Sequence, residues 1–331
     1  MENIRLIGGR SNPKFAEGLA KYLGISLVKC TIIDFANGEI YVEIHENIRG
    51  MNVFFIQTGA NSPDRKRSIN DFYVEALQVA DACRRSDVGS IGIIYPTFPY
   101  ARSDKKNKPR VSIMSSVISN GLKNAGYTRI ICMDIHAGQI QGFVHLPFDN
   151  LYAIKLQLDY LRKFVFRDLT SGEINSRFVL VSPDVGGSKR IRDFAKRLEM
   201  PYAIMDKQRD YSKPGVVLES ALIGQNVKDR TAIVIDDMAD TMGTMISAVN
   251  DLKDHGVNNV IIVVTHGVLS GPAIDRINDC DIISQVIVTD TIDQSLNIKK
   301  CSKLQVVETY NLFGDVIHRI VSGTSISELF E

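Results

Sequence analysis

The sequence predicts an α/β protein made of two similar domains, each a parallel β-sheet with helices on both faces. Three observations predict this class. Short apolar runs alternate with amphipathic stretches, one segment recurs later in the chain, and 331 residues suit two domains of ordinary size.

Six short apolar runs, rich in β-branched residues, are the expected strands. They contain few charges, and helical patterns separate them, which is typical of parallel strands buried on both faces. The runs cover residues 53–56, 91–95, 130–133, 179–181, 232–235 and 260–264.

An internal repeat predicts that the two domains are related. Leu122-Lys-Asn-Ala-Gly-Tyr-Thr-Arg-Ile-Ile-Cys-Met-Asp-Ile-His136 reappears as Leu252-Lys-Asp-His-Gly-Val-Asn-Asn-Val-Ile-Ile-Val-Val-Thr-His266, with Leu, Lys, Gly, Ile and His in register. Both copies read as a helix end, a glycine cap, a buried strand and a histidine at the carboxyl end of that strand.

Composition excludes several classes of function. The net charge is +1, which argues against a general nucleic-acid binder. No leader and no long apolar stretch is present, so we expect neither a membrane segment nor a targeting signal. The five cysteines form no CxxC pair, which indicates neither a zinc cluster nor a disulfide framework and favours the reducing cytoplasm.

The most informative segment is Thr231-Ala-Ile-Val-Ile-Asp-Asp-Met-Ala-Asp-Thr-Met-Gly-Thr244. An apolar strand ends in two carboxylates, and a turn of small and hydroxyl residues then leads into a helix. Such a turn offers backbone N–H groups, hydroxyls and a helix N-terminus to a phosphate, while the acidic pair suits sugar hydroxyls. We expect Asp240 to cap the helix. The chain contains no GxxxxGK[ST] motif, which excludes a Walker-type nucleotide loop.

A basic loop distinguishes the first domain from the second. The connection from the strand at 91–95 to the first copy of the repeat is longer than the connection from the strand at 232–235 to the second copy. The additional residues include Tyr100-Ala-Arg-Ser-Asp-Lys-Lys-Asn-Lys-Pro-Arg110. A loop at the carboxyl end of a parallel strand is a common place for ligand contacts, although a solvated surface loop is the alternative interpretation.

Together, these residues resemble the phosphoribosyl pyrophosphate synthetases (ribose-phosphate pyrophosphokinases) nearly end to end. The acidic loop resembles the fingerprint of type I phosphoribosyltransferases. The motifs that carry the resemblance are Phe35-Ala-Asn-Gly-Glu39, Phe98-Pro-Tyr-Ala-Arg102, Asp134-Ile-His-Ala-Gly-Gln-Ile-Gln-Gly-Phe143, Ser182-Pro-Asp-Val-Gly-Gly187, Lys207-Gln-Arg209, residues 236–244, Thr265-His-Gly267 and Ser270-Gly-Pro-Ala273.

The resemblance implies both the fold and the reaction. Each domain would have the phosphoribosyltransferase-like (Rossmann-like) fold. Residues 1–153 plus 322–331 would bind ATP, and residues 154–321 would bind ribose 5-phosphate. The enzyme would transfer the β,γ-diphosphoryl group of ATP to the C1 hydroxyl of ribose 5-phosphate, giving phosphoribosyl diphosphate and AMP for nucleotide biosynthesis.

The resemblance also implies roles for individual residues. Lys207 and Arg209 would be catalytic, on a mobile flag over the transferring phosphates. The sites for ribose 5-phosphate would be Asp236, Asp237, Asp240, Thr241, Met242, Gly243, Thr244 and Arg209. The sites for ATP would be Phe35, Asn37, Gly38 and Glu39 from a neighbouring subunit, together with Arg102, Ser103, Asp104 and His136.

The same resemblance implies a metal, effectors and an assembly. Mg²⁺ would lie near His136 and Asp184, with Asp134 and Asp149 nearby. Inorganic phosphate or ADP would act at a subunit interface through Arg49 and the C-terminal segment that holds Ser325. The active form would be a homo-oligomer, of the hexamer-of-dimers type. His266 is expected to be structural.

Departures from the family pattern leave alternatives open. Ser103 replaces the usual glutamine of the basic loop, Ser112 and Ser116 replace a proline and a lysine after Arg110, and His145 replaces an acidic residue. These changes favour, weakly, a non-catalytic regulatory paralogue. A phosphoribosyltransferase that consumes the diphosphate is the other alternative, although two related halves argue against it.

Overall fold

The computed structural model describes residues 3–209 and 217–330, which divide into two compact units. The N-terminal unit comprises Met1–Ala153, Asp290–Leu296 and Glu308–Glu331, and the C-terminal unit comprises Ile154–Thr289 and Asn297–Val307. The first break thus falls where we placed the domain boundary. Residues 290–296 and 308–321, however, lie in the N-terminal unit, whereas the sequence analysis assigned them to the second domain.

The N-terminal unit contains a five-stranded parallel sheet in the order β1-β4-β5-β6-β7, and β2 and β3 form a separate antiparallel hairpin. Its elements are β1 (Ile4–Gly8), α1 (Pro13–Leu23), β2 (Cys30–Asp34), β3 (Ile40–Ile44), β4 (Asn52–Ile56), α2 (Ile69–Arg85), β5 (Ser90–Tyr95), α3 (Met114–Ala125), β6 (Arg129–Met133), the 3₁₀-helix η1 (Gly138–Gly142), β7 (Phe148–Leu151), α9 (Tyr310–Ser322) and the 3₁₀-helix η4 (Ser327–Leu329).

The C-terminal unit contains a seven-stranded sheet in the order β10-β9-β8-β11-β12-β13-β14, in which only the pairing of β10 with β9 is antiparallel among the described pairs. Its elements are α4 (Ile154–Tyr160), the π-helical turn η2 (Leu161–Val165), α5 (Ser171–Arg177), β8 (Phe178–Ser182), the 3₁₀-helix η3 (Val185–Gly187), α6 (Ser188–Leu198), β9 (Tyr202–Arg209), β10 (Val217–Gly224), β11 (Thr231–Ala239), α7 (Gly243–Asp254), β12 (Asn259–Gly267), α8 (Ala273–Asp279), β13 (Ile283–Thr289) and β14 (Leu304–Val307).

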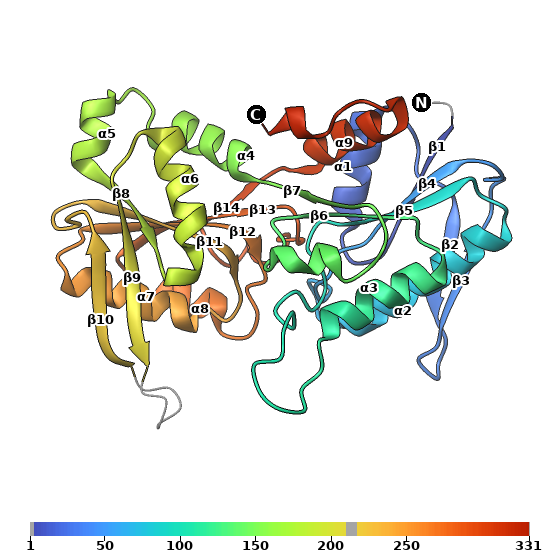
Figure 1. Cartoon of the computed structure of the whole chain (residues 1–331), viewed down its shortest axis with the longest axis horizontal. Helices are drawn as coiled ribbons and strands as arrows, with labels where there is room; N and C mark the ends of the chain where they lie inside the picture. Colours follow the sequence, from blue (N-terminus) through green and yellow to red (C-terminus); the bar gives the residue numbers. More distant parts are fainter. Residues whose placement is uncertain (1–2, 210–216, 331) are drawn as a thin grey trace. The chain divides into compact units, whose positions relative to one another are not determined.

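Helices cover both faces of each sheet, which confirms the predicted fold class (Figure 1). In β4, Val53 and Phe55 pack with α2 and α3, while Phe54 and Ile56 pack with α1 and α9. In the C-terminal unit, alternate residues of β11 pack with α7 and α8 on one face and with α4 and α6 on the other. Burial on both faces explains why the strands read as continuous apolar runs.

The internal repeat corresponds to equivalent places in the two sheets. Strand β6 lies between β5 and β7, and β12 lies between β11 and β13. The glycines that precede them, Gly126 and Gly256, have φ angles of 122° and 82°, a region that favours glycine at a helix end. All six predicted strands are present. In the described ranges, no helix has both the length and the apolar character needed to cross a membrane.

Candidate active site

The acidic pair lies in the last part of β11, at the carboxyl edge of the sheet of the C-terminal unit. Arg190, in the first turn of α6, bridges both carboxylates. Its Nη1 lies 2.8 Å from Asp236 Oδ1, and its Nη2 lies 3.2 Å from Asp237 Oδ1. The backbone N–H of Asp237 also donates to Asp236 Oδ1, at 2.9 Å. The pair is thus held in one orientation by a charged fork and a backbone donor.

Burial and the neighbouring negative charge both disfavour the ionised form of Asp236. Burial raises the pKa of Asp236, the charge of Asp237 raises it further, and the Arg190 guanidinium lowers it. The Asp237 side chain is almost completely buried, at 6% exposure. Arg190 therefore supplies the charge that keeps two adjacent carboxylates together in this site.

The loop from Asp240 to Thr244 connects β11 to α7, and contacts from other loops fix its backbone. Ser270 Oγ donates to Asp240 Oδ1, and Arg276 Nη1 donates to the carbonyl oxygen of Thr241 at 2.6 Å. Ser270 N donates to the carbonyl oxygen of Asp240 at 3.1 Å. The loop is therefore shaped before any ligand binds.

The side chains of this loop point in different directions. Met242 is buried in the core below α7, whereas Thr241, Gly243 and Thr244 are exposed. Exposed hydroxyls beside a helix N-terminus form a suitable cradle for a phosphate. The prediction that Asp240 caps α7 is wrong. The cap position is Met242, with a φ of 64° and no side-chain cap, and Asp240 instead accepts a hydrogen bond from Ser270.

Residues 35–39, predicted to contact adenine, form the exposed tip of the β2–β3 hairpin. Phe35 N donates to the carbonyl oxygen of Glu39 at 2.7 Å, and Glu39 N donates to Asn37 Oδ1 at 3.1 Å. Gly38 has a φ of 88°, which the tight turn requires. The Phe35 ring is 48% exposed, and its centroid lies 5.8 Å from that of Tyr41. An aromatic ring presented this way is available for stacking.

The basic loop between β5 and α3 is anchored at one end. Arg102 is exposed, whereas Asp104 is buried and accepts a hydrogen bond from Gln139 Nε2. Ser103 Oγ accepts a hydrogen bond from Met114 N at 3.1 Å, at the start of α3. The serine that departs from the family pattern thus helps to fix the end of the loop.

The residues predicted to hold a metal have different environments. His136 and Asp184 are exposed, and Asp184 Oδ1 accepts a hydrogen bond from Gly187 N at 3.1 Å. Asp134 Oδ2 accepts one from Ala153 N at 3.2 Å, and Asp149 pairs with Arg129 at 2.5 Å. Across residues 3–209 and 217–330, no three or more His, Cys, Asp or Glu side chains gather as a metal site would need. His266 is buried within β12.

The flag and the regulatory residues complete the predicted set. Lys207 and Arg209 lie in β9, where they pair with Ser220 and Val217 of β10, and their side chains fall outside the described part of the structure. Arg49 is exposed, and its Nε lies 3.5 Å from Asp87 Oδ2. The carbonyl oxygen of Ser325 accepts a hydrogen bond from Arg319.

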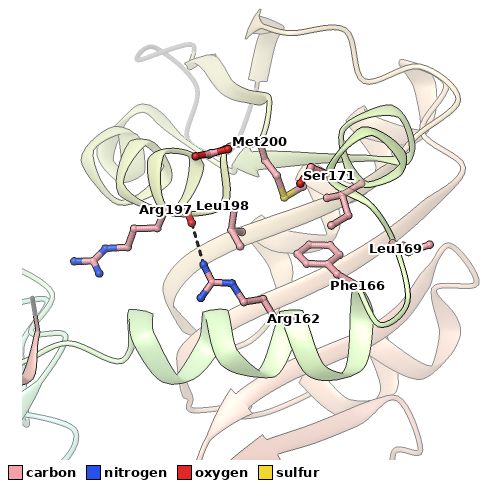
Figure 2. Close-up of a pocket in the computed structure, with 9 residues that line it drawn as sticks. Arg162, Phe166, Leu169, Ser171, Arg197, Leu198 and Met200 are labelled. Carbon is pink, nitrogen blue, oxygen red and sulfur yellow. Dashed lines mark hydrogen bonds between the residues drawn. The ribbon is translucent and has the colours of Figure 1, made fainter.

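A separate groove lies at the opposite edge of the C-terminal sheet, where α6 ends and β9 begins (Figure 2). Its volume is about 450 Å³. Arg162 Nη2 donates to the carbonyl oxygen of Arg197 at 3.0 Å along one side, and Phe166 and Met200 form apolar parts of its wall. None of the site residues predicted from the sequence lines this groove.

Family models match both ends of the chain. Residues 4–126 match the N-terminal domain of ribose phosphate pyrophosphokinase, and residues 212–331 match the phosphoribosyl synthetase-associated domain. Ribose-phosphate pyrophosphokinase 2 of Schizosaccharomyces pombe is 42% identical over 328 residues, which is 99% of this chain and 97% of the relative. The chain belongs to the ribose-phosphate pyrophosphokinase family.

The fold agrees with this membership. The crystal structure of phosphoribosylpyrophosphate synthetase from Mycobacterium smegmatis superimposes with a TM-score of 0.86 at 35% identity, covering 97% of this chain and 99% of that one. The predicted family, the fold class and the assignment to an enzyme family are therefore confirmed.

Arg190, Ser270 and Arg276 shape the site but are not among the residues predicted from the sequence. Arg190 was not singled out, although a basic residue shortly after the Gly186-Gly187 turn was a signal for it. Ser270 lies within the Ser270-Gly-Pro-Ala273 motif, and no sequence pattern marks Arg276. Their contacts with the acidic loop depend on the tertiary structure, which brings separate loops together.

Proposed function

We propose that this chain transfers the β,γ-diphosphoryl group of ATP to the C1 hydroxyl of ribose 5-phosphate, giving phosphoribosyl diphosphate and AMP for nucleotide biosynthesis. The single observation that carries the proposal is the acidic pair bridged by Arg190 beside the prepared loop at the start of α7. Full-length similarity to ribose-phosphate pyrophosphokinases supports it.

Ribose 5-phosphate would bind with its two ends at different parts of this loop. The 5-phosphate would accept hydrogen bonds at the N-terminus of α7 and from the hydroxyls of Thr241 and Thr244, which are exposed. Asp236 and Asp237 would accept hydrogen bonds from the ribose hydroxyls. Because both ends of ribose 5-phosphate are fixed, its C1 hydroxyl is oriented for in-line attack on the β-phosphorus of ATP. This positioning lowers the activation barrier for diphosphoryl transfer.

The charge that develops on the transferring phosphates needs cations. Lys207 would provide a compact charge and Arg209 a planar fork, and both suit oxygens that become more negative during transfer. On the nucleotide side, Phe35 would stack on adenine, and Asn37, Gly38 and Glu39 would contact its edge from a neighbouring subunit. Arg102, Ser103, Asp104 and His136 would complete that site.

The donor set fits a Mg²⁺ ion that is shared with the substrate. Mg²⁺ is usually held by one or two carboxylates together with phosphate oxygens. Asp184 of the C-terminal unit and His136 of the N-terminal unit are both exposed, and each would be a ligand of the ion. Asp134 and Asp149 already contact Ala153 N and Arg129, so they would lie near the ion rather than bind it. When bound, the ion would neutralise triphosphate charge.

Assembly and regulation follow from the same proposal. Since the Phe35 motif would serve a neighbouring subunit, the active form would be a homo-oligomer of the hexamer-of-dimers type. Inorganic phosphate and ADP would act through Arg49 and the segment containing Ser325. Five free cysteines favour the cytoplasm as the working compartment.

The test is to incubate the protein with ATP, ribose 5-phosphate and Mg²⁺ and to identify the products by mass spectrometry. We expect phosphoribosyl diphosphate and AMP in equal amounts. Formation of ADP with a phosphorylated sugar would indicate an ordinary kinase. If the purified protein shows no turnover but stimulates the turnover of an added active relative, it is a regulatory paralogue.

A further inference from the structure

Two arginines hold Asp34, the last residue of β2, from two directions. Arg10 Nη2 lies 2.8 Å from Asp34 Oδ1. Arg67 contacts Asp34 Oδ2 with both Nε, at 2.8 Å, and Nη2, at 2.6 Å. Both carboxylate oxygens are therefore engaged by charged donors, whose hydrogen bonds are stronger than those between neutral groups. We call Arg10, Asp34 and Arg67 the arginine clamp.

Arg10 is fixed by a buried partner. Its Nε lies 2.8 Å from Glu75 Oε2, and its backbone N–H donates to Glu75 Oε1 at 3.0 Å. Glu75 lies on α2, is completely buried, and also accepts a hydrogen bond from Gln57 Nε2 at 2.9 Å. The Arg10 side chain is only 16% exposed. The clamp is therefore continuous with the interior of the N-terminal unit.

Arg67 is fixed through its backbone. Its N–H donates to Ser62 Oγ, and its carbonyl oxygen accepts from Ser62 N, both at 3.0 Å. Ser62 is buried, and Ser62 Oγ lies 2.7 Å from Asp64 Oδ1. This closed loop directly precedes α2, which begins with a capping box at Ser68. Both arginines therefore reach Asp34 from ordered positions.

Asp34 directly precedes the exposed tip at residues 35–39. The hairpin pairing ends at Asp34 and Ile40, and beyond it the tip has one short turn of backbone hydrogen bonds. The strands of the hairpin pack on the core of the N-terminal unit through Ile32 and Val42, whereas the tip beyond Asp34 is exposed. A contact at the end of the paired strands therefore acts directly on the part of the hairpin that the core does not hold. A surface ion pair usually contributes little to stability, but this clamp joins the tip to a buried network.

We propose that the arginine clamp positions the hairpin tip for nucleotide binding, so that Asp34, Arg10 and Arg67 are positioning residues for the ATP site. This inference rests on the proposed function, which places Phe35, Asn37 and Glu39 against the nucleotide. The three clamp residues act through the backbone of the tip and do not contact the substrate. Their loss raises the KM for ATP, because ATP must then order a mobile tip.

The kinetic test compares Asp34→Asn and Arg67→Gln with a matched control. Asp81 on α2 also receives two arginines, at 3.0 Å from Arg84 and 2.6 Å from Arg85, but does not adjoin the tip. We expect the KM for ATP to rise on the order of tenfold in both clamp variants, with an unchanged KM for ribose 5-phosphate and an unchanged thermal midpoint. Asp81→Asn should match the wild type.

A double variant tests whether the two residues act through one interaction. Asp34→Asn combined with Arg67→Gln should raise the KM for ATP no further than Asp34→Asn alone, because the first change already removes the partner of the second. If the rises in the KM for ATP of the two single variants multiply in the double variant, Asp34 and Arg67 do not act through one interaction. An equal rise in both substrate KM values would also overturn the inference, because the effect would then be general.

A second readout does not depend on activity. The sequence has no tryptophan, so Phe35→Trp places the only indole of the chain at the tip. We expect its fluorescence anisotropy to fall and its quenching by acrylamide to rise when Asp34→Asn is added, but not when Asp81→Asn is added. Unchanged tip mobility, or greater mobility with an unchanged KM for ATP, would overturn the inference. If the wild type made no phosphoribosyl diphosphate, the proposed function would fail, and the anisotropy alone would decide whether the clamp orders the tip.

Discussion

Replacing Arg190 with methionine removes the charge that bridges the acidic pair while keeping a side chain of similar length. Arg190 is 30% exposed, whereas Asp236 and Asp237 are 22% and 6% exposed. Removing one partner of a fully buried ion pair costs about 3–5 kcal/mol. Because Arg190 retains contact with solvent, we expect a smaller loss of about 2 kcal/mol in the free energy of unfolding.

The loss should depend on pH in a defined direction. The pKa of Asp236 is raised by burial and by Asp237, so the folded state binds its proton more tightly than the unfolded state. Stability therefore falls as pH rises from the ordinary carboxylate pKa to the raised one. Without Arg190 the raised pKa increases further, so the destabilisation of the variant should be larger at pH 8 than at pH 5.

The assay is thermal unfolding of Arg190→Met beside Arg192→Met, an exposed arginine on the same helix. For a domain of this size, about 2 kcal/mol corresponds to a decrease of about 4–8 °C in the unfolding midpoint. Arg192→Met should change the midpoint by less than about 1 °C. Equal midpoints for the two variants at both pH values would refute the assignment of Arg190 as the bridge.

Five further substitutions test other parts of the account. Lys207→Ala and Arg209→Ala should each lower turnover at least about a hundredfold with little effect on ribose 5-phosphate affinity, and a variant that keeps half the wild-type rate would exclude that residue from catalysis. Thr244→Ala should weaken ribose 5-phosphate binding about fivefold in calorimetry, whereas unchanged affinity would contradict the cradle. Burial raises the pKa of Asp290 to about 7, so the stability of the wild type should fall as pH rises from about 4 to 7. Asp290→Asn should flatten this pH dependence of the unfolding midpoint in thermal melts. An unaltered slope would show that Asp290 is not its cause. Arg49→Ala should abolish the response of turnover to inorganic phosphate or ADP while basal turnover persists, and a surviving response would place the effector elsewhere.

Strands buried on both faces were predictable because their sequence signal is local. The run at 232–235 and its repeat partner at 260–264 lie in β11 and β12, and the glycine caps occur where the repeat places them. Strands β2 and β3 were missed because they are partly exposed, and β7 was missed because it is short and contains Asp149 and Asn150. Strands β1 and β13 were also missed although they are largely buried, because Arg5 and Ser284-Gln285 interrupt their apolar runs.

The site was predictable only where its residues are adjacent in sequence. The order of Asp236, Asp237 and the following small-residue turn is enough to predict the proposed sugar-phosphate site from the sequence. By contrast, Arg190 is 46 positions from Asp236, and the two meet only because β8 pairs with β11. The incorrect cap at Asp240 has a similar cause, because Ser270 competes for that carboxylate from a distant loop.

The central claim is that ATP is cleaved between its α- and β-phosphates with transfer of the diphosphoryl group, and the position of a radioactive label tests it directly. The protein is supplied with ribose 5-phosphate, Mg²⁺ and ATP labelled with ³²P at either the α or the β position. We predict that the β label appears in phosphoribosyl diphosphate and that the α label remains in AMP. Recovery of the β label in ADP or in free phosphate, with no labelled phosphoribosyl diphosphate, would contradict the account.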